Sequence, residues 1–230
     1  MESRVTVGNG NQEMSIDEGT LASGDPVTNV TMTIEAGTQI KGQTGSFANL
    51  IITRGSMLMA EGTADAPIVF SSDDAGFDGA GEWGGLIMHG YAPHNECLTA
   101  DQGAVACNVD SEGESGFGGG YSPDDSSGVL RYVIVTEGGF EFATGNEING
   151  ISLIGVGSGT EMEYIQVNGN ADDGIEFYGG SVSVRYMVLT GNQDDSVDWD
   201  EGWSGNLQFL LVDQGPDATG NVIEADTEGT

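Results

Sequence analysis

Apolar and polar residues alternate in short runs near the C-terminus, and these runs recur at a fixed spacing. Residues 175–177 and 197–199 each place an acidic residue between two apolar ones, so the step from 175 to 197 defines a 22-residue repeat. Strict alternation over a few residues predicts a β-strand with one buried face. The strand before each run shows the same spacing, through Ile165, Met187 and Phe209 and through Val167, Leu189 and Leu211. We therefore predict that this strand keeps the same register from coil to coil.

A fixed period of this length is typical of solenoids, in which each coil buries its apolar face against its neighbours. Earlier in the chain the spacing shortens to 18 residues, because residues 68–70 resemble residues 86–88. The same spacing relates Ile34, Gly37 and Ile40 to Ile52, Gly55 and Leu58. Strands this short cannot close as hairpins at such spacings, and no segment shows a sustained helical stripe. The sequence predicts an all-β fold, a parallel β-helix.

The coils are interrupted once. We divide the chain into an N-terminal cap or strand at residues 1–27 and a β-helix at residues 28–230, with a polar loop insertion at about residues 89–127. The repeat resumes after the insertion, because Val129–Val135 resembles the segment 32 residues later. Solenoids need capping at both ends, and the chain ends without a recognisable cap, so we expect it to be part of a longer protein.

Two cysteines, Cys97 and Cys107, lie in the insertion with nine residues between them. A thiolate metal site would need more Cys or His nearby, and the chain holds only two histidines, His89 and His94. A short loop closed by two cysteines is typical of proteins from oxidising compartments. We therefore predict a disulfide between Cys97 and Cys107 that pins the insertion to the solenoid.

Charge narrows the set of partners. The chain has 37 acidic and 5 basic residues, for a net charge of −32. Such a surface repels nucleic acid and anionic membranes, because phosphate contacts need Lys and Arg. Cations, extracellular glycans and other surface proteins remain as partners. No stretch approaches the roughly 20 apolar residues of a membrane span, and the N-terminus carries no apolar export segment.

Four motifs together resemble a known family. They are Thr33–Thr38, Gly81–Leu86, Asn146–Ile151 and Asp172–Gly180. As a set they are similar to a family of exported bacterial proteins, the lipoproteins and surface proteins of marine Gammaproteobacteria and Bacteroidetes. The resemblance implies a right-handed β-helix and a location outside the cell or on the outer-membrane surface. It supplies no catalytic residues.

Aspartates gather at the corners of the 22-residue repeat. The candidate metal ligands are Asp172, Asp173, Asp194, Asp195, Asp198 and Asp200. Ca²⁺ takes six to eight oxygen ligands, and stacked coils lie about 4.8 Å apart, so carboxylates of adjacent coils could share one ion. The alternative is that these are turn residues, since Asp accepts backbone hydrogen bonds in tight corners.

An enzyme is the competing interpretation. Right-handed β-helices include polysaccharide lyases and polygalacturonase-like hydrolases, and the hydrolases resemble this chain in having an Asp-Asp pair at a corner. The Gly-His-Gly and Arg-x-Lys segments of those hydrolases are absent here. Arg185 is the best candidate for the basic residue of a lyase, and its alternative role is a salt bridge to Glu163.

Aromatic residues offer a further route to glycan binding. The candidates are Trp83, Trp199, Trp203, Tyr121, Phe177 and Tyr178. Trp199 and Phe177 fall at inward positions, whereas Trp203 and Tyr178 follow Gly-rich corners and are the candidates for exposure. The sequence thus predicts a non-enzymatic extracellular or cell-surface scaffold for adhesion or envelope interaction, stabilised by Ca²⁺ and able to bind glycans. A polysaccharide lyase, a hydrolase or a remnant of one is the alternative.

Overall fold

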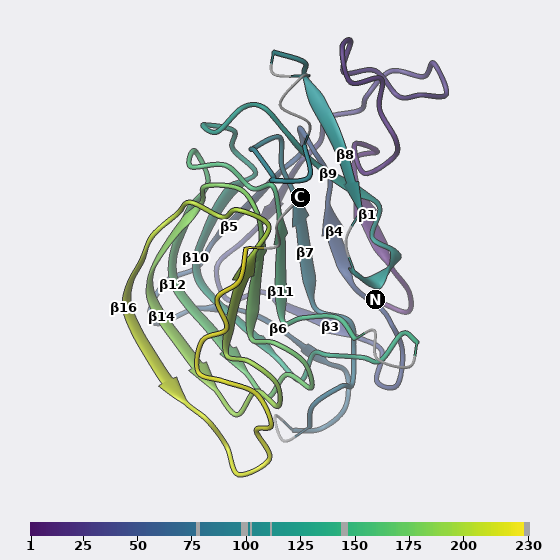
Figure 1. The fold of residues 1–230 in the computed structure, drawn as a ribbon. Helices are drawn as coiled ribbons and strands as arrows, with labels where there is room; N and C mark the ends of the chain where they lie inside the picture. The colour runs from purple at the N-terminus through teal and green to yellow at the C-terminus, as the bar shows by residue number, and fades with distance from the viewer. Residues whose placement is uncertain (77–78, 98–100, 102, 111, 144–146, 228–230) are drawn as a thin grey trace.

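Two parallel sheets wound from successive coils form the molecule (Figure 1). The computed structural model describes the chain except residues 77–78, 98–100, 102, 111, 144–146 and 228–230. Asn146 of the third motif and parts of the insertion therefore lie outside the described residues. The described residues contain no α-helix. The prediction of a parallel β-helix is confirmed.

The first sheet takes one short strand from each coil. Its order is β1 (Val5–Val7), β4 (Leu50–Ile52), β7 (Leu86–His89), β11 (Ile151–Ile154), β13 (Ile175–Tyr178) and β15 (Val197–Asp200). The second sheet runs in the order β16 (Leu207–Asp213), β14 (Ser183–Thr190), β12 (Glu161–Asn168), β10 (Gly128–Thr136), β5 (Met57–Glu61) and β2 (Thr31–Ile34). β6 (Ile68–Ser72) pairs with β10, and β3 (Gln39–Gly42) pairs with β6.

The predicted spacings of 32 residues from β10 to β12 and of 22 residues from β12 to β14 match the observed strand pairing. Leu130 of β10 lies beside Met162 of β12, which lies beside Val184 of β14. All three side chains are buried in the core between the sheets. Each coil thus covers the apolar surface of the one before, which is the source of stability in a solenoid.

The regular spacing is wrong for the last coil. Ile165 pairs with Met187 as predicted, but Met187 pairs with Leu210 and not with Phe209, so the last step is one residue longer. The corner between β15 and β16 is one residue longer than the corner between β13 and β14. Because side chains alternate along a strand, one extra residue turns the pattern over. Phe209 and Leu211 consequently point outward, with 60% and 61% of their surfaces exposed.

The shorter repeat in the N-terminal half is also wrong. It relates strands of different sheets, since β6 belongs to the second sheet and β7 to the first. Leu58, the predicted equivalent of Ile40, pairs instead with Met32, and the true partner of Ile40 is Phe70. Short apolar triplets look alike in every sheet of a β-helix, so their spacing alone does not tell which strands pair.

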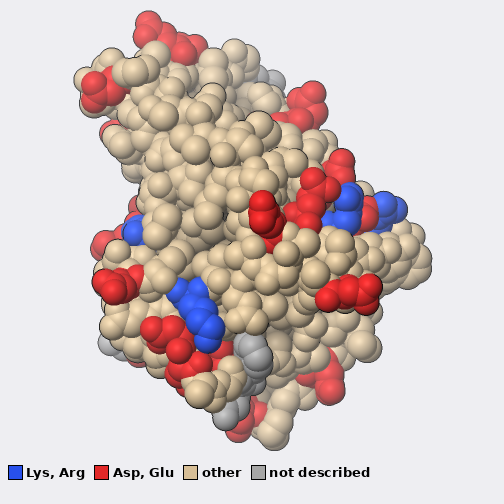
Figure 2. Space-filling view, turned by 180° about the vertical axis from the view of Figure 1, so that it is seen from behind, with Lys and Arg blue, Asp and Glu red and all other residues tan. Residues whose placement is uncertain are grey.

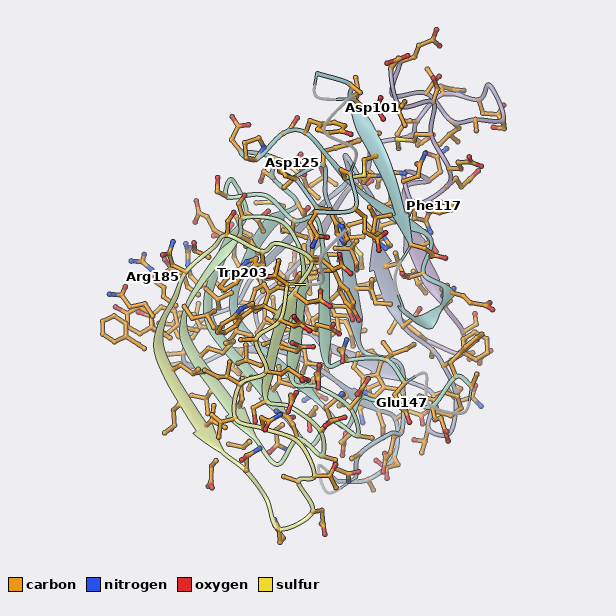
Figure 3. All side chains as sticks on the ribbon, viewed as in Figure 1. Asp101, Phe117, Asp125, Glu147, Arg185 and Trp203 are labelled. Atoms are coloured by element: carbon orange, nitrogen blue, oxygen red, sulfur yellow. A yellow bond between two sulfur atoms is a disulfide. The ribbon has the colours of Figure 1, made fainter. Side chains whose placement is uncertain are left out.

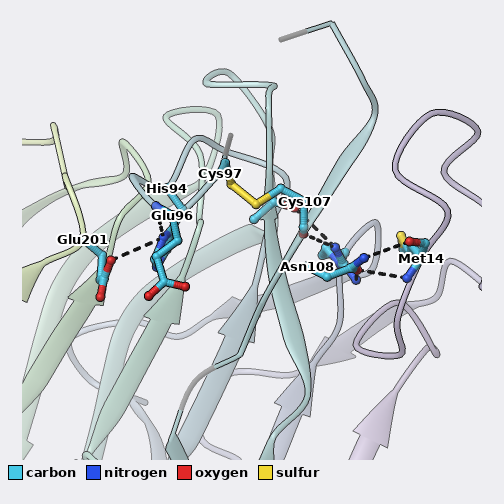
Figure 4. Close-up of a disulfide and its surroundings, with 9 residues drawn as sticks. Met14, His94, Glu96, Cys97, Cys107, Asn108 and Glu201 are labelled. Atoms are coloured by element: carbon cyan, nitrogen blue, oxygen red, sulfur yellow. Dashed lines mark hydrogen bonds and ion pairs between the residues drawn. A yellow bond between two sulfur atoms is a disulfide. The ribbon is translucent and has the colours of Figure 1, made fainter. Parts of the chain in front are cut away.

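The insertion forms a hairpin tied to the first coils. Strands β8 (Ala106–Asp110) and β9 (Phe117–Gly120) are antiparallel, with a 3₁₀ turn, η2 (Glu112–Glu114), between them. The predicted disulfide between Cys97 and Cys107 is confirmed (Figure 4). Beside it the buried Arg54 guanidinium donates to the carbonyl oxygens of Cys107 and Gly10, at 2.7 Å each. This one side chain therefore joins the insertion to the N-terminal segment.

Most of the aromatic candidates for glycan binding serve the core instead. Trp83 and Phe177 are fully buried, and Trp203 packs against Phe177 with ring centroids 4.6 Å apart. Trp203 is partly buried within the last coils (Figure 3). Tyr178 is only 8% exposed. The expected exposure of Tyr178 is thus wrong, because its ring joins a buried cluster with Ile148 and Ile154. Trp203 is only partly open to solvent, because its ring packs against Phe177 and its Nε1 donates to the Val182 carbonyl oxygen.

Candidate cation site

The outer face of the first sheet carries a column of acidic side chains. Glu176 of β13 lies beside Asp198 of β15 in the parallel ladder. The chain returns along β15 once more, since Val197 bridges to Ile223 and the Glu224 amide donates to the Val197 carbonyl oxygen at 2.9 Å. Glu224 therefore continues the column, and we name Glu176, Asp198, Glu224 and the corner aspartates before β13 and β15 the acidic face.

Asp173 is the centre of this face. Carboxylate oxygens of Asp172, Asp173 and Asp194 all lie within 4.8 Å of one another. A second group, Asp173, Glu176 and Asp198, meets the same limit. Asp173 belongs to both groups because it lies two residues before β13, between the corner and the strand. A divalent cation at either position would have three carboxylates within reach, the hard oxygen ligands that Ca²⁺ takes.

The local fold holds Asp173 in place. The Asp195 amide donates to its Oδ1 at 3.0 Å, so the corner of one coil accepts a bond from the next. Asn170 Nδ2 donates to the Asp173 carbonyl oxygen at 2.7 Å. The following residue is Gly174, where a Cβ would lie 2.4 Å from Asn192 Nδ2. Only glycine fits there, which lets the corner bring its carboxylates close to the neighbouring coil.

Asp195 and Asp200 lie outside the two carboxylate groups. Asp195 is buried, and its Oδ1 accepts a hydrogen bond from the Asn221 amide. Its carboxyl also bonds to the side chain of Glu224. Asp200 ends β15, and neither carboxylate group contains it or Asp195. The turn role considered for the corner aspartates thus describes Asp195, and it also describes one oxygen of Asp173.

Burial and like charge act together on this face. Burial, followed by the charges of Asp172 and Asp198, raises the pKa of Asp173 to about 9. Burial and the Asp195 charge also raise the pKa values of Asp194 and Asp198. A hydrogen bond to Asp195 and its charge raise the pKa of Glu224 to about 7. All four pKa values are raised, which indicates that the acidic face favours added positive charge, either protons or a cation.

The chain matches one family model, described as a pectate-lyase-like β-helix domain, over residues 19–230. The match covers most of the chain. The protein belongs to this β-helix family. Neither a search of curated proteins nor a search of solved structures finds a match. No helix among the described residues is long and apolar enough to cross a membrane.

In this pectate-lyase-like domain the basic side chains are held away from the acidic face. All five are described. Lys41 reaches the Asp74 carbonyl oxygen, Arg4 bonds to the carbonyl oxygens of Gly113 and Glu114, and Arg54 is buried under the insertion. Arg131 and Arg185 lie on the second sheet. On the face seen in Figure 2, Lys and Arg form a few separate patches, each next to Asp or Glu.

The predicted alternative role of Arg185 is the one that the structure shows. Its Nε donates to Glu163 Oε1 at 2.6 Å, and the side chain projects outward from the second sheet (Figure 3). His94 has a similarly local role. Its Nδ1 lies 3.5 Å from Glu201 but accepts a bond from the Glu96 amide, and burial lowers its pKa to about 4. His94 is therefore neutral at pH 7 despite the nearby carboxylate (Figure 4).

Sequence reasoning missed two members of the acidic face, Glu176 and Glu224. The alternation around Glu176 already placed it outward, so its side of the sheet was readable. The short distance from Glu176 to Asp173 could not be predicted, because it depends on the path of the chain from the corner into β13. Glu224 follows a coil four residues longer than the preceding one, since Val197 bridges to Ile223 rather than to residue 219. No fixed repeat would have aligned it.

Proposed function

We propose that this chain is a non-catalytic β-helix scaffold that acts outside the cell or at the cell surface, in adhesion or envelope interaction, with Ca²⁺ bound on its acidic face. The observation that carries the proposal is the double membership of Asp173 in two groups of three carboxylates within 4.8 Å. Such a cluster favours a hard divalent cation, and Ca²⁺ accepts irregular sets of oxygen ligands. The disulfide fits an oxidising compartment.

Thermal unfolding with EDTA and with added Ca²⁺ tests the cation. A ligand that binds only the folded state raises the melting temperature with increasing concentration. We expect Ca²⁺ to do so in the wild-type chain and not in Asp173→Asn, which keeps the acceptor oxygen for the Asp195 amide. Asp65→Asn, at an exposed turn between β5 and β6, is the matched control. An unchanged melting temperature in wild-type protein, together with no heat of binding by calorimetry, would exclude the site.

A polysaccharide-active enzyme is the second candidate, favoured by the family to which the chain belongs. The placement of all five basic residues away from the acidic face argues against a lyase site on that face, because a lyase needs a base beside its acidic substrate. Incubation with alginate, pectin and agarose oligomers distinguishes the two proposals. New unsaturated ends or new reducing ends would make the chain an enzyme. Their loss in Asp173→Asn would place the chemistry on the acidic face.

A further inference from the structure

Four successive coils each place one aromatic residue on the outer face of the second sheet. The four are Tyr132, Tyr164, Tyr186 and Phe209. Each has a positive φ, between 50° and 61°, which is uncommon for bulky side chains. This left-handed residue bends the strand, so that it and the residue before it both point outward. The same bend in four coils builds an aromatic column along the solenoid.

The rings of the aromatic column are stacked in parallel and offset from one another. Neighbouring centroids are 4.4, 4.6 and 4.9 Å apart, and the ring planes differ by no more than 10°. Carbon atoms in contact are roughly 3.5–4.0 Å apart, so parallel rings at these centroid distances must be offset. Part of each ring consequently stays open to solvent. Tyr164 and Tyr186 are 38% and 37% exposed, and Phe209 is 60% exposed.

The column forms one side of a groove of about 690 Å³. The floor comes from the outward residues two positions after each ring, of which three are apolar and one is polar: Ile134, Gln166, Val188 and Leu211. These residues are in register across β10, β12, β14 and β16, so the groove follows the solenoid axis. An open, mostly apolar strip of this kind marks an interaction surface.

A polar ladder borders the groove. The residue before each aromatic ring is Arg131, Glu163, Arg185 or Gln208, and these four are in register. Arg131 lies 3.0–3.6 Å from carboxylates of Glu61, Glu161 and Glu163, and Arg185 is bonded to Glu163. Two cations thus face three carboxylates. The border is nearly neutral, although the chain carries a net charge of −32.

We propose that this groove binds an uncharged linear polysaccharide lying along the solenoid axis. Each of these four coils offers the same pair, one planar hydrogen-bonding side chain and one aromatic ring, which suits a ligand that repeats. Aromatic rings accept the apolar faces of sugars, while Arg, Glu and Gln can bond to hydroxyls. A charged polymer is disfavoured, because the border has no free cation for an anion and the molecule as a whole repels polyuronates. The proposal is independent of the acidic face on the first sheet.

Isothermal titration with hexaoses and disaccharides of cellulose, xylan, mannan and agarose tests this assignment, run in EDTA and again in Ca²⁺. We expect at least one hexaose to bind more tightly than its disaccharide under both conditions. The double variant Tyr164→Asn/Tyr186→Asn should weaken that binding about tenfold or more. Asn adopts positive φ readily, so the bends are kept while the rings are removed.

The control is Phe47→Ala, which removes another exposed ring, one that packs edge-on against Phe142 at 5.9 Å and lies outside the groove. It should bind the hexaose as the wild type does. Circular dichroism and thermal unfolding check that the double variant is folded. Three results would overturn the proposal: no binding of any neutral hexaose, undiminished binding by the folded double variant, or binding of polygalacturonate in preference to every neutral chain. Loss of the Ca²⁺ effect in Asp173→Asn bears only on the acidic face.

Discussion

On the outer face of the second sheet, successive coils alternate in charge, with Glu61 beside Arg131, Arg131 beside Glu163, and Glu163 beside Arg185. On the outer face of the first sheet, the coils of Glu163 and Arg185 place Glu176 beside Asp198, and the next coil adds Glu224. Stacking at about 4.8 Å makes either pattern repeat along the axis.

The contrast shows that the order of charges within a ladder, more than the net charge of the chain, decides whether a face is stable without bound protons or cations. The alternating ladder neutralises itself with side chains of its own chain. The acidic face has no basic side chain, so its carboxylates gain stability only from protons or from an ion. A solenoid can therefore carry a cation-dependent face and a cation-independent face on the same coils.

The largest expected effect comes from neutralising the centre of the acidic face. Asp173→Asn in EDTA at pH 7 should raise the free energy of unfolding by about 4 kcal/mol, because folding raises the pKa of Asp173 from 3.8 to about 9 and the wild type must take up a proton. Saturating Ca²⁺ should stabilise the wild type and leave the variant unchanged. Urea unfolding in both buffers measures the difference. A destabilised variant in EDTA would mean that Asp173 is held by favourable contacts, and the contrast between the faces would fail.

The pH dependence follows from the same shifts. Between pH 4 and 9 the folded chain holds a proton on Asp173 that the unfolded chain has released, so stability falls as pH rises. The slope in EDTA should be about 1.4 kcal/mol per pH unit for this one proton, and Asp194, Asp198 and Glu224 add to it in the same sense. Ca²⁺ should flatten the curve. A series of melts from pH 5 to 8 checks this, and a flat curve in EDTA would contradict it.

The sequence alone was enough for the architecture and for the stacking of the corner at Asp172 and Asp173 on the corner at Asp194 and Asp195. Alternation and spacing carry that information when coils are of equal length, as with β12, β13, β14 and β15. Prediction failed where one corner gained residues, since a single insertion before β16 reversed the sides of Phe209 and Leu211. The aromatic column was missed for a related reason: a positive φ places two successive residues outward, and no alternation rule anticipates that.

A matched pair of glutamates compares the two faces directly. Glu163→Gln removes a carboxylate that contacts both Arg131 and Arg185, and it should cost about 1 kcal/mol. Glu176→Gln removes a carboxylate from the group with Asp173 and Asp198 but keeps an acceptor for Asn149, so in EDTA it should stabilise by a similar amount. Urea unfolding should show changes of opposite sign in the free energy of unfolding for the two variants. Equal signs would show that ladder order does not govern these faces.

The smallest effects belong to the ends of the alternating ladder. Among the described residues, Arg131 contacts three carboxylates and Arg185 contacts one, that of Glu163; the Arg185 side chain is half-exposed. Surface ion pairs contribute little to stability, so Arg131→Gln should cost up to about 1 kcal/mol and Arg185→Gln clearly less. High NaCl should shrink both losses, because it screens exposed charges. A larger loss for Arg185→Gln, unaffected by salt, would point to its contact over the Tyr186 ring, 5.9 Å from the centroid, as the interaction that matters at this end of the ladder.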